Sequence, residues 1–170
     1  MKLSSKGQYA VRALIYLTYN SHHLNGGQIP ISLNDIAKNE SISLHYLEQI
    51  FFILKKAGIV KSLRGPKGGY MLNKKPSEIF IGDIIASVEP IEIISCISKS
   101  KNKEECGRKS VCLAFDMWNS ISNKITEFLN SITIEDVINE YKQKQGQKNI
   151  IESKYKSSEG SAKSPRRNCR

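Results

Sequence analysis

Three of the four cysteines in this 170-residue chain lie within one charged stretch, from Cys96 to Cys112. The stretch is CISKSKNKEECGRKSVC, and its remaining residues are mostly lysine, serine and glutamate. The three thiols could be incidental, could form one disulfide with one cysteine left over, or could be an incomplete set of metal ligands. Thiolates are the usual ligands of iron-sulfur clusters. The sequence on either side of the stretch is needed to choose between these possibilities.

The composition is that of a globular protein, with 39% hydrophobic and 25% charged residues. No apolar run approaches the roughly 20 residues that a membrane span needs. Residues 1–19 alternate apolar with polar side chains and do not form the apolar core of a signal peptide. We therefore expect a cytoplasmic protein that makes no use of a membrane. In that compartment structural disulfides are uncommon, and clustered cysteines are more often metal ligands or redox sensors.

The positive charge is unevenly distributed along the chain. Residues 1–80 contain 11 Lys and Arg against 4 Asp and Glu, a net charge of +7. The net charge is −2 over residues 81–145, with 8 basic and 10 acidic residues, and +5 over residues 146–170, with 7 and 2. A basic first half suggests a polyanionic partner for that half alone. The alternative is that the charge serves only solubility.

Apolar residues at helical spacing predict two helices in the first forty residues. The first helix runs over residues 5–20, and its apolar stripe is Ala10, Ala13, Leu14 and Leu17. Ser32 and Asp35 resemble a capping box that opens a short second helix through Lys38.

A third helix and a hairpin then complete a winged helix-turn-helix. Ser43 is the expected N-cap of the third helix, and Gly58 stands where a left-handed C-terminal glycine belongs. Residues 59–63 and 70–72 are two short strands joined by the turn RGPKGG. This order of elements is typical of a DNA-binding domain, although the same fold can serve as a protein-docking module.

The second half is expected to consist of helices around the cysteine stretch. A fourth helix begins at Ile81 and ends near Pro90, and a long helix covers residues 113–130. An apolar seam follows the long helix, formed by Ala114, Trp118, Ile121, Ile125 and Phe128. A second copy of the chain is the natural partner for this seam, because most bacterial helix-turn-helix proteins are two-fold dimers. The alternative is that the seam packs on the first helix of the same chain. Thr133 and Asp136 cap a last helix to about Gln143.

We therefore predict a mainly α-helical protein, a winged helix-turn-helix with a β-hairpin wing plus a long dimerisation helix. Residues 1–80 would be the DNA-binding domain, and residues 81–145 the cysteine-containing loop with the dimerisation helices. Residues 146–170 are polar and without period, and we expect a disordered tail there. Cys169 belongs to that tail and is left out of any site. No acid-base or nucleophilic constellation appears, so an enzyme is not expected.

Four residues are predicted to project from the third helix toward a double-stranded DNA operator: His45, Tyr46, Glu48 and Gln49. Glu48 can accept a hydrogen bond from cytosine N4, and Gln49 can pair with adenine. On the turn, Arg64 and Gly65 begin a tip thin enough to enter a minor groove. Lys61 and Lys67 would be phosphate contacts without sequence content. The alternative is an ordinary solvated helix face and an ordinary charged hairpin turn.

Several stretches resemble IscR-like iron-sulfur cluster regulators and the wider Rrf-two family of bacterial repressors. They are SSKGQYAVRALIYL, ISLHYLEQIFFILKKAGIVKSLRGPKGGY, GDIIASVEP and CLAFDMW, and the similarity covers residues 1 to about 140. The resemblance implies a dimeric repressor of iron-sulfur cluster assembly genes, in which the residues named above occupy the base-reading positions. It also implies a 2Fe-2S cluster held by Cys96, Cys106 and Cys112.

The cysteine region departs from that family in two ways. Nine residues separate Cys96 from Cys106, a wider interval than in IscR-like members, and five separate Cys106 from Cys112. Phe115 stands where those members have a histidine ligand, and a phenyl ring cannot bind iron. Candidates for a fourth ligand are Asp116, Glu105, Gln8, His22 and His23.

Other sensors therefore remain open. Zinc is the competing metal. A repressor of the same family without a cluster is the competing function, acting as a thiol redox or nitric oxide sensor or as a regulator of cysteine metabolism.

Overall fold

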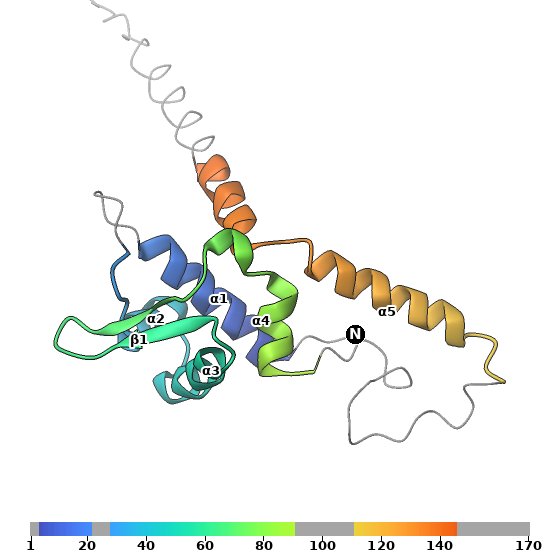
Figure 1. The fold of residues 1–170 in the computed structure, drawn as a ribbon, viewed down its shortest axis with the longest axis horizontal. Coiled ribbons are helices and arrows are strands. Elements are labelled where there is room, and N and C mark those ends of the chain that lie inside the picture. The colour runs from blue at the N-terminus through green and yellow to red at the C-terminus, as the bar shows by residue number, and fades with distance from the viewer. Residues whose placement is uncertain (1–3, 22–27, 91–110, 146–170) are drawn as a thin grey trace, which may run out of the picture. The chain divides into compact units, whose positions relative to one another are not determined.

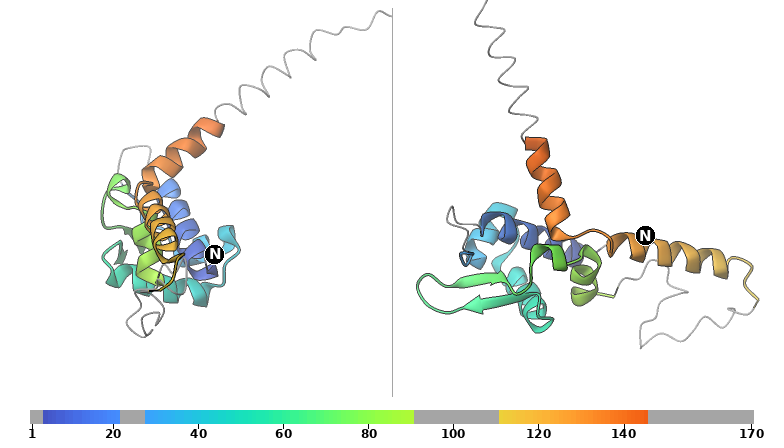
Figure 2. Two further views of the ribbon diagram at one scale, coloured as in Figure 1. Left: turned by 90° about the vertical axis from the view of Figure 1, so that its right-hand side faces the viewer. Right: turned by 45° about the horizontal axis from the view of Figure 1, so that its top comes forward.

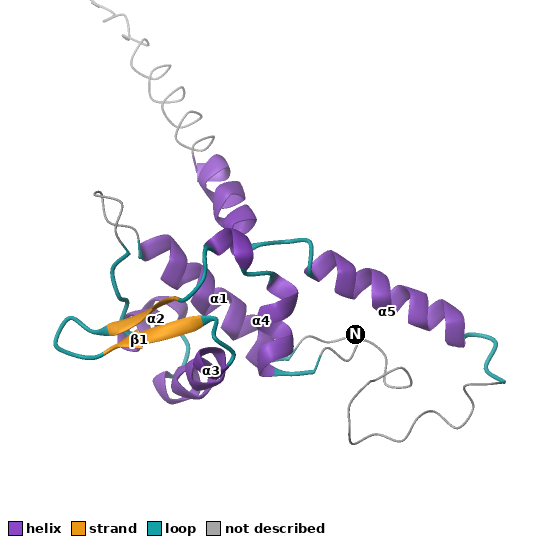
Figure 3. Cartoon of the chain, viewed as in Figure 1, coloured by secondary structure: helices purple, strands orange, loops and turns teal. Residues whose placement is uncertain are grey.

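The computed structural model describes residues 4–21, 28–90 and 111–145. The described chain is mostly helical and carries one antiparallel pair of strands, as predicted (Figures 1 and 3). The chain divides into two compact units, Met1–Val137 and Ile138–Arg170. Across the described ranges, no helix is both long enough and apolar enough to cross a membrane.

Helix α1 (Ser5–Asn20) has the predicted bounds and the predicted inward stripe. Ser4 caps it, because its hydroxyl oxygen accepts a hydrogen bond from the backbone N–H of Lys6 at 3.1 Å. The four apolar residues of the stripe are completely buried: Ala10, Ala13, Leu14 and Leu17.

Helix α2 (Leu33–Glu40) begins with the predicted capping box. The hydroxyl of Ser32 accepts a hydrogen bond from the backbone N–H of Asp35 at 3.1 Å. The helix ends at Glu40 and not at Lys38. Ser41 ends it by adopting the left-handed conformation, with φ of 54°.

Helix α3 (Leu44–Lys56) buries one face, formed by Leu47, Ile50, Phe51 and Leu54. Ser43 occupies the N-cap position as predicted, although its side chain makes no capping hydrogen bond. Gly58 follows the helix with φ of 73°, the left-handed conformation expected for it.

Strands β1 (Val60–Leu63) and β2 (Gly69–Leu72) form the predicted hairpin, with Val60 opposite Leu72 and Leu63 opposite Gly69. Its glycine-rich tip extends past α1, α2 and α3 in Figure 1 and in the right-hand view of Figure 2. Ile31 adds a bridge that the sequence did not predict, exchanging both backbone hydrogen bonds with Tyr70 at 2.8 and 3.0 Å. The segment that leads into α2 is thereby fastened to the hairpin.

A short 3₁₀ helix, η1 (Pro76–Glu78), leads into α4 (Ile81–Val88), whose predicted apolar face is buried. Helix α5 (Phe115–Leu129) is the predicted long helix, and its bounds are slightly tighter than the predicted residues 113–130. The chain then returns to α4, where the N–H of Ile81 donates to the carbonyl of Ile132 at 2.9 Å. Thr133 and Asp136 form the expected cap, and a last helix covers residues 134–145.

Candidate nucleic-acid interface

Three of the four residues predicted to read DNA lie together on the exposed side of α3. His45, Glu48 and Gln49 are all exposed, and we call these three side chains the reading face. The imidazole of His45 is 3.1 Å from the amide nitrogen of Gln49 and 3.8 Å from a carboxylate oxygen of Glu48. Among the described residues, the structure gives these polar groups no side-chain partners except one another, so base edges can replace those contacts at little cost.

Tyr46, the fourth predicted residue, has different surroundings. It is half-buried, and its ring meets the ring of Tyr9 edge to face, with 5.9 Å between the ring centroids. The guanidinium carbon of Arg12 lies 5.7 Å from the centroid of the Tyr9 ring. The geometry therefore makes Tyr46 an anchor between α1 and α3 as well as a candidate for DNA contact.

Arg12 also fixes the end of α2, the first helix of the helix-turn-helix. Its guanidinium donates to a side-chain oxygen of Glu40 at 3.0 Å and to the backbone carbonyl of the same residue at 2.7 Å. The turn between α2 and α3 starts at that carbonyl, so Arg12 and Tyr9 together hold the direction of α3. Reasoning from the sequence missed both residues, because their role depends on how α1 crosses the other two helices.

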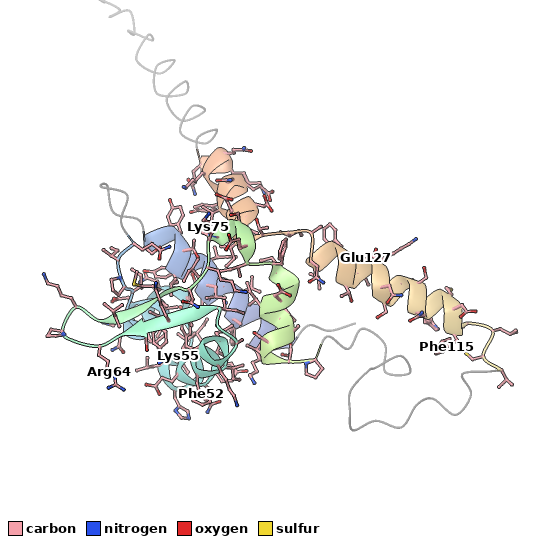
Figure 4. All side chains as sticks on the ribbon, viewed as in Figure 1. Phe52, Lys55, Arg64, Lys75, Phe115 and Glu127 are labelled. Atoms are coloured by element: carbon pink, nitrogen blue, oxygen red, sulfur yellow. The ribbon has the colours of Figure 1, made fainter. Side chains whose placement is uncertain are left out.

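The wing is tied to the same helix. The ammonium group of Lys55 on α3 donates to the hydroxyl of Ser62 on β1 at 2.7 Å. Residues 63–67, which include Arg64, Gly65 and Lys67, are all exposed, and Gly65 has φ of 120°, which favours glycine. In Figure 4 the side chain of Arg64 lies on the same side of the hairpin as α3 with its residues Lys55 and Phe52. Side chains alternate along a strand, so Lys61 faces away from Ser62 and from that side.

The candidate metal ligands lie mostly outside the described residues. Cys96, Cys106, Glu105, His22 and His23 belong to the parts that are not described, whereas Cys112 is an exposed free thiol just before α5. The carbonyl of Cys112 accepts a hydrogen bond from the N–H of Phe115 at 3.1 Å, and Asp116 is exposed in the first turn of α5. In the described ranges, no three His, Cys, Asp or Glu side chains come close enough to hold a metal ion.

The donor set can still be compared with a 2Fe-2S cluster. Three soft thiolates suit iron-sulfur chemistry, and they also suit zinc. Phe115, which is half-buried at the start of α5, contributes no donor atom. Cys96, Cys106 and Cys112 could therefore provide three of the four ligands of a 2Fe-2S cluster, and the fourth ligand is unassigned.

Helix α5 carries its apolar seam without burying it. None of its residues is buried, and Phe128 and Trp118 have exposed fractions of 64% and 39%. The alternative in which the seam is buried on α1 of the same chain therefore has no support from burial. A seam of this kind is typical of a helix that meets a partner.

Comparisons with known proteins agree with this geometry. A family model named Rrf2 and described as an iron-dependent transcriptional regulator matches residues 3–140. The transcriptional regulator IscR of Pectobacterium atrosepticum is 40% identical over 140 residues, which cover 82% of this chain and 80% of that protein.

Two solved structures are also similar to this chain. The structure of IscR from T. potens has a TM-score of 0.65 at 34% identity, covering 85% of this chain and 91% of that one. CymR, the global cysteine regulator of B. subtilis, has a TM-score of 0.59 at 36% identity, covering 81% and 95%. The chain therefore belongs to the Rrf2 (Rrf-two) family of DNA-binding transcriptional regulators.

Proposed function

We propose that this regulator is a dimeric repressor of iron-sulfur cluster assembly genes and that it senses cluster supply through a 2Fe-2S cluster on Cys96, Cys106 and Cys112. The observation that carries the proposal is the position of Cys112. Its exposed thiol lies immediately before α5, in a member of a family described as iron-dependent. Ligation at that point can influence how α5 is presented to a partner.

Operator binding would use two parts of the first unit. The reading face would enter the major groove, where Glu48 can accept from cytosine N4 and Gln49 can pair with adenine. The tip with Arg64 and Gly65 would reach the neighbouring minor groove, with Lys67 on a phosphate. Lys61 faces the other side of the strand, so we no longer expect it to contact the same duplex. The hydrogen bond between Lys55 and Ser62 supports this docking, because it couples the position of the wing to that of α3.

Dimerisation would use the seam of α5. The ring of Phe128 is 64% exposed, and apolar surface in contact with water is unfavourable. Burying the ring against a second copy would therefore stabilise the dimer. Two copies related by a two-fold axis would also present two reading faces to the two halves of an operator.

The cysteines would supply thiolate ligands at the start of that helix. A bound 2Fe-2S cluster would supply a metal centre that is lost when oxygen destroys it or when iron is short. Because Phe115 provides no donor, the fourth bond has to come from another residue, such as Asp116, and we expect the centre to be more labile than one with four cysteines. Zinc remains the competing metal at three thiolates.

A second candidate is a repressor of the same family without a cluster. It would respond to thiol oxidation or nitric oxide, or would regulate cysteine metabolism. Two observations favour it, the absence of a histidine at Phe115 and the structural similarity to a cysteine regulator.

Anaerobic purification with visible spectra and with iron, sulfide and zinc analysis separates the two candidates. The proposal predicts iron and sulfide in equal amounts, with visible absorption that disappears when any one of Cys96, Cys106 and Cys112 is replaced by alanine. Cys169→Ala is the matched control and should keep the absorption. Stoichiometric zinc without sulfide would contradict the cluster and favour the second candidate.

A further inference from the structure

Phe52 is an exposed phenylalanine on the helix that is proposed to read DNA. Its exposed fraction is 68%, whereas the adjacent Phe51 is fully buried and packs on the ring of Tyr70 at 4.9 Å between centroids. The core of the unit is therefore complete without the Phe52 ring. A single exposed apolar side chain is common on protein surfaces, so a role for Phe52 in a contact depends on where it lies.

The position of Phe52 on α3 continues the reading face. It follows Glu48 by four residues and Gln49 by three, and these spacings place side chains on the same side of a helix. A helix rises about 1.5 Å per residue, so Phe52 lies about 4.5 Å further along the axis than Gln49. That distance corresponds to between one and two base-pair steps of DNA, each about 3.4 Å.

The surroundings of Phe52 are cationic. Lys55 and Lys56 are exposed one turn further along α3, and Lys55 reaches Ser62 of the wing at 2.7 Å. In Figure 4, Arg64 extends from the hairpin on the side where α3 lies with Phe52 and Lys55. The ring thus lies between the reading face and the wing, on a surface whose charge complements DNA.

We propose that Phe52 is a specificity residue that recognises thymine through its C5 methyl group. This inference rests on the proposed docking of α3 in the major groove. The thymine methyl is the apolar group that base pairs present there, and phenylalanine is one of the side chains that contact it. The recognised thymine lies one or two base pairs from the pair read by Gln49.

The experiment selects duplexes from a random library with the wild-type chain, Phe52→Ala and Lys56→Ala. The wild-type consensus should contain one thymine in each half-site that Phe52→Ala no longer prefers, with the preferences at other positions kept. Lys56→Ala should weaken binding to every duplex and keep the full consensus, because it removes a charge and no apolar contact. Circular dichroism of Phe52→Ala should match that of the wild type, since the ring is exposed.

A second arm replaces that thymine with deoxyuridine, which lacks only the methyl group. Wild-type affinity should fall about fourfold, which corresponds to the free energy of burying one methyl group. Phe52→Ala should bind both duplexes equally. If Phe52→Ala selects the wild-type consensus, or loses affinity for both duplexes while still distinguishing them, the Phe52 inference is wrong and the docking of α3 stands. If the wild-type chain selects no consensus at all, the proposed docking fails, and the inference fails with it.

Discussion

Glu48 is the acidic member of the reading face, and its carboxylate would repel phosphate unless it reaches a base. At the residue scale, the side chains of the interface should therefore differ in what they contribute to binding. Glu48→Ala should relax discrimination against wrong bases more than it lowers the affinity for the cognate operator. Competition binding with duplexes changed at single base pairs measures this. An unchanged preference would show that the face of α3 has been assigned wrongly.

Arg64 and Lys67 allow a second comparison at the same scale, because both are basic side chains at the exposed tip of the wing. Arg64→Ala should cost about 1 to 3 kcal/mol at the cognate site if the guanidinium contacts bases. Lys67→Ala should weaken cognate and random DNA alike and reduce the salt slope by about one unit. Affinities measured over a range of salt concentrations distinguish the two outcomes. Equal effects of both substitutions on cognate and random DNA would remove Arg64 from the base-reading residues.

At the scale of elements, the hairpin depends on a close backbone contact. A Cβ atom added at Gly69 would lie 2.5 Å from the carbonyl oxygen of Ile31, and a backbone atom cannot move aside cheaply. Gly69→Ala should therefore lower the free energy of unfolding by about 1 to 3 kcal/mol. Lys67→Ala, on the exposed tip of the same hairpin, is the control and should stay within about 0.5 kcal/mol of the wild type. Urea titration of the three proteins checks this, and equal midpoints would contradict the contact.

Local signals allowed most elements to be predicted from the sequence. Ser32 with Asp35 and Thr133 with Asp136 are capping patterns a few residues long, and the structure confirms both. Gly58 likewise needs only its own helix end to be recognised. The bridge between Ile31 and Tyr70 could not be predicted, because it joins segments far apart in the chain.

The same distinction applies to the site. Exposure of His45, Glu48 and Gln49 follows from helical periodicity, and it was predicted. The anchoring of Tyr46 by Tyr9 depends on the crossing of α1 and α3, which no local pattern encodes. Helical periodicity assigns Phe51 to the buried face of α3 and turns Phe52 away from it. The exposed fraction of Phe52, 68%, could not be predicted, because it depends on which distant segments leave the ring uncovered.

At the scale of the whole molecule, the exposed seam predicts a dimer. Phe128→Glu would place a carboxylate in the proposed interface, so the variant should be monomeric at micromolar concentration, where the wild type is dimeric. Asn123→Glu is the matched control, because it adds the same charge at an exposed position on the other side of α5. Light scattering reports both masses. A monomeric wild-type protein would contradict the proposed interface.

The claim that cluster occupancy sets DNA binding is tested most directly by the affinity of one protein preparation for its selected operator, measured before and after iron removal under anaerobic conditions. Cys112 lies beside the helix that is proposed to hold the dimer, so ligation should change the relative placement of the two reading faces. We expect the two affinities to differ by about tenfold or more, a typical coupling between sites. The variant with alanine at Cys96, Cys106 and Cys112 should show a single affinity under both conditions. Equal affinities of the wild-type chain before and after iron removal would contradict the claim.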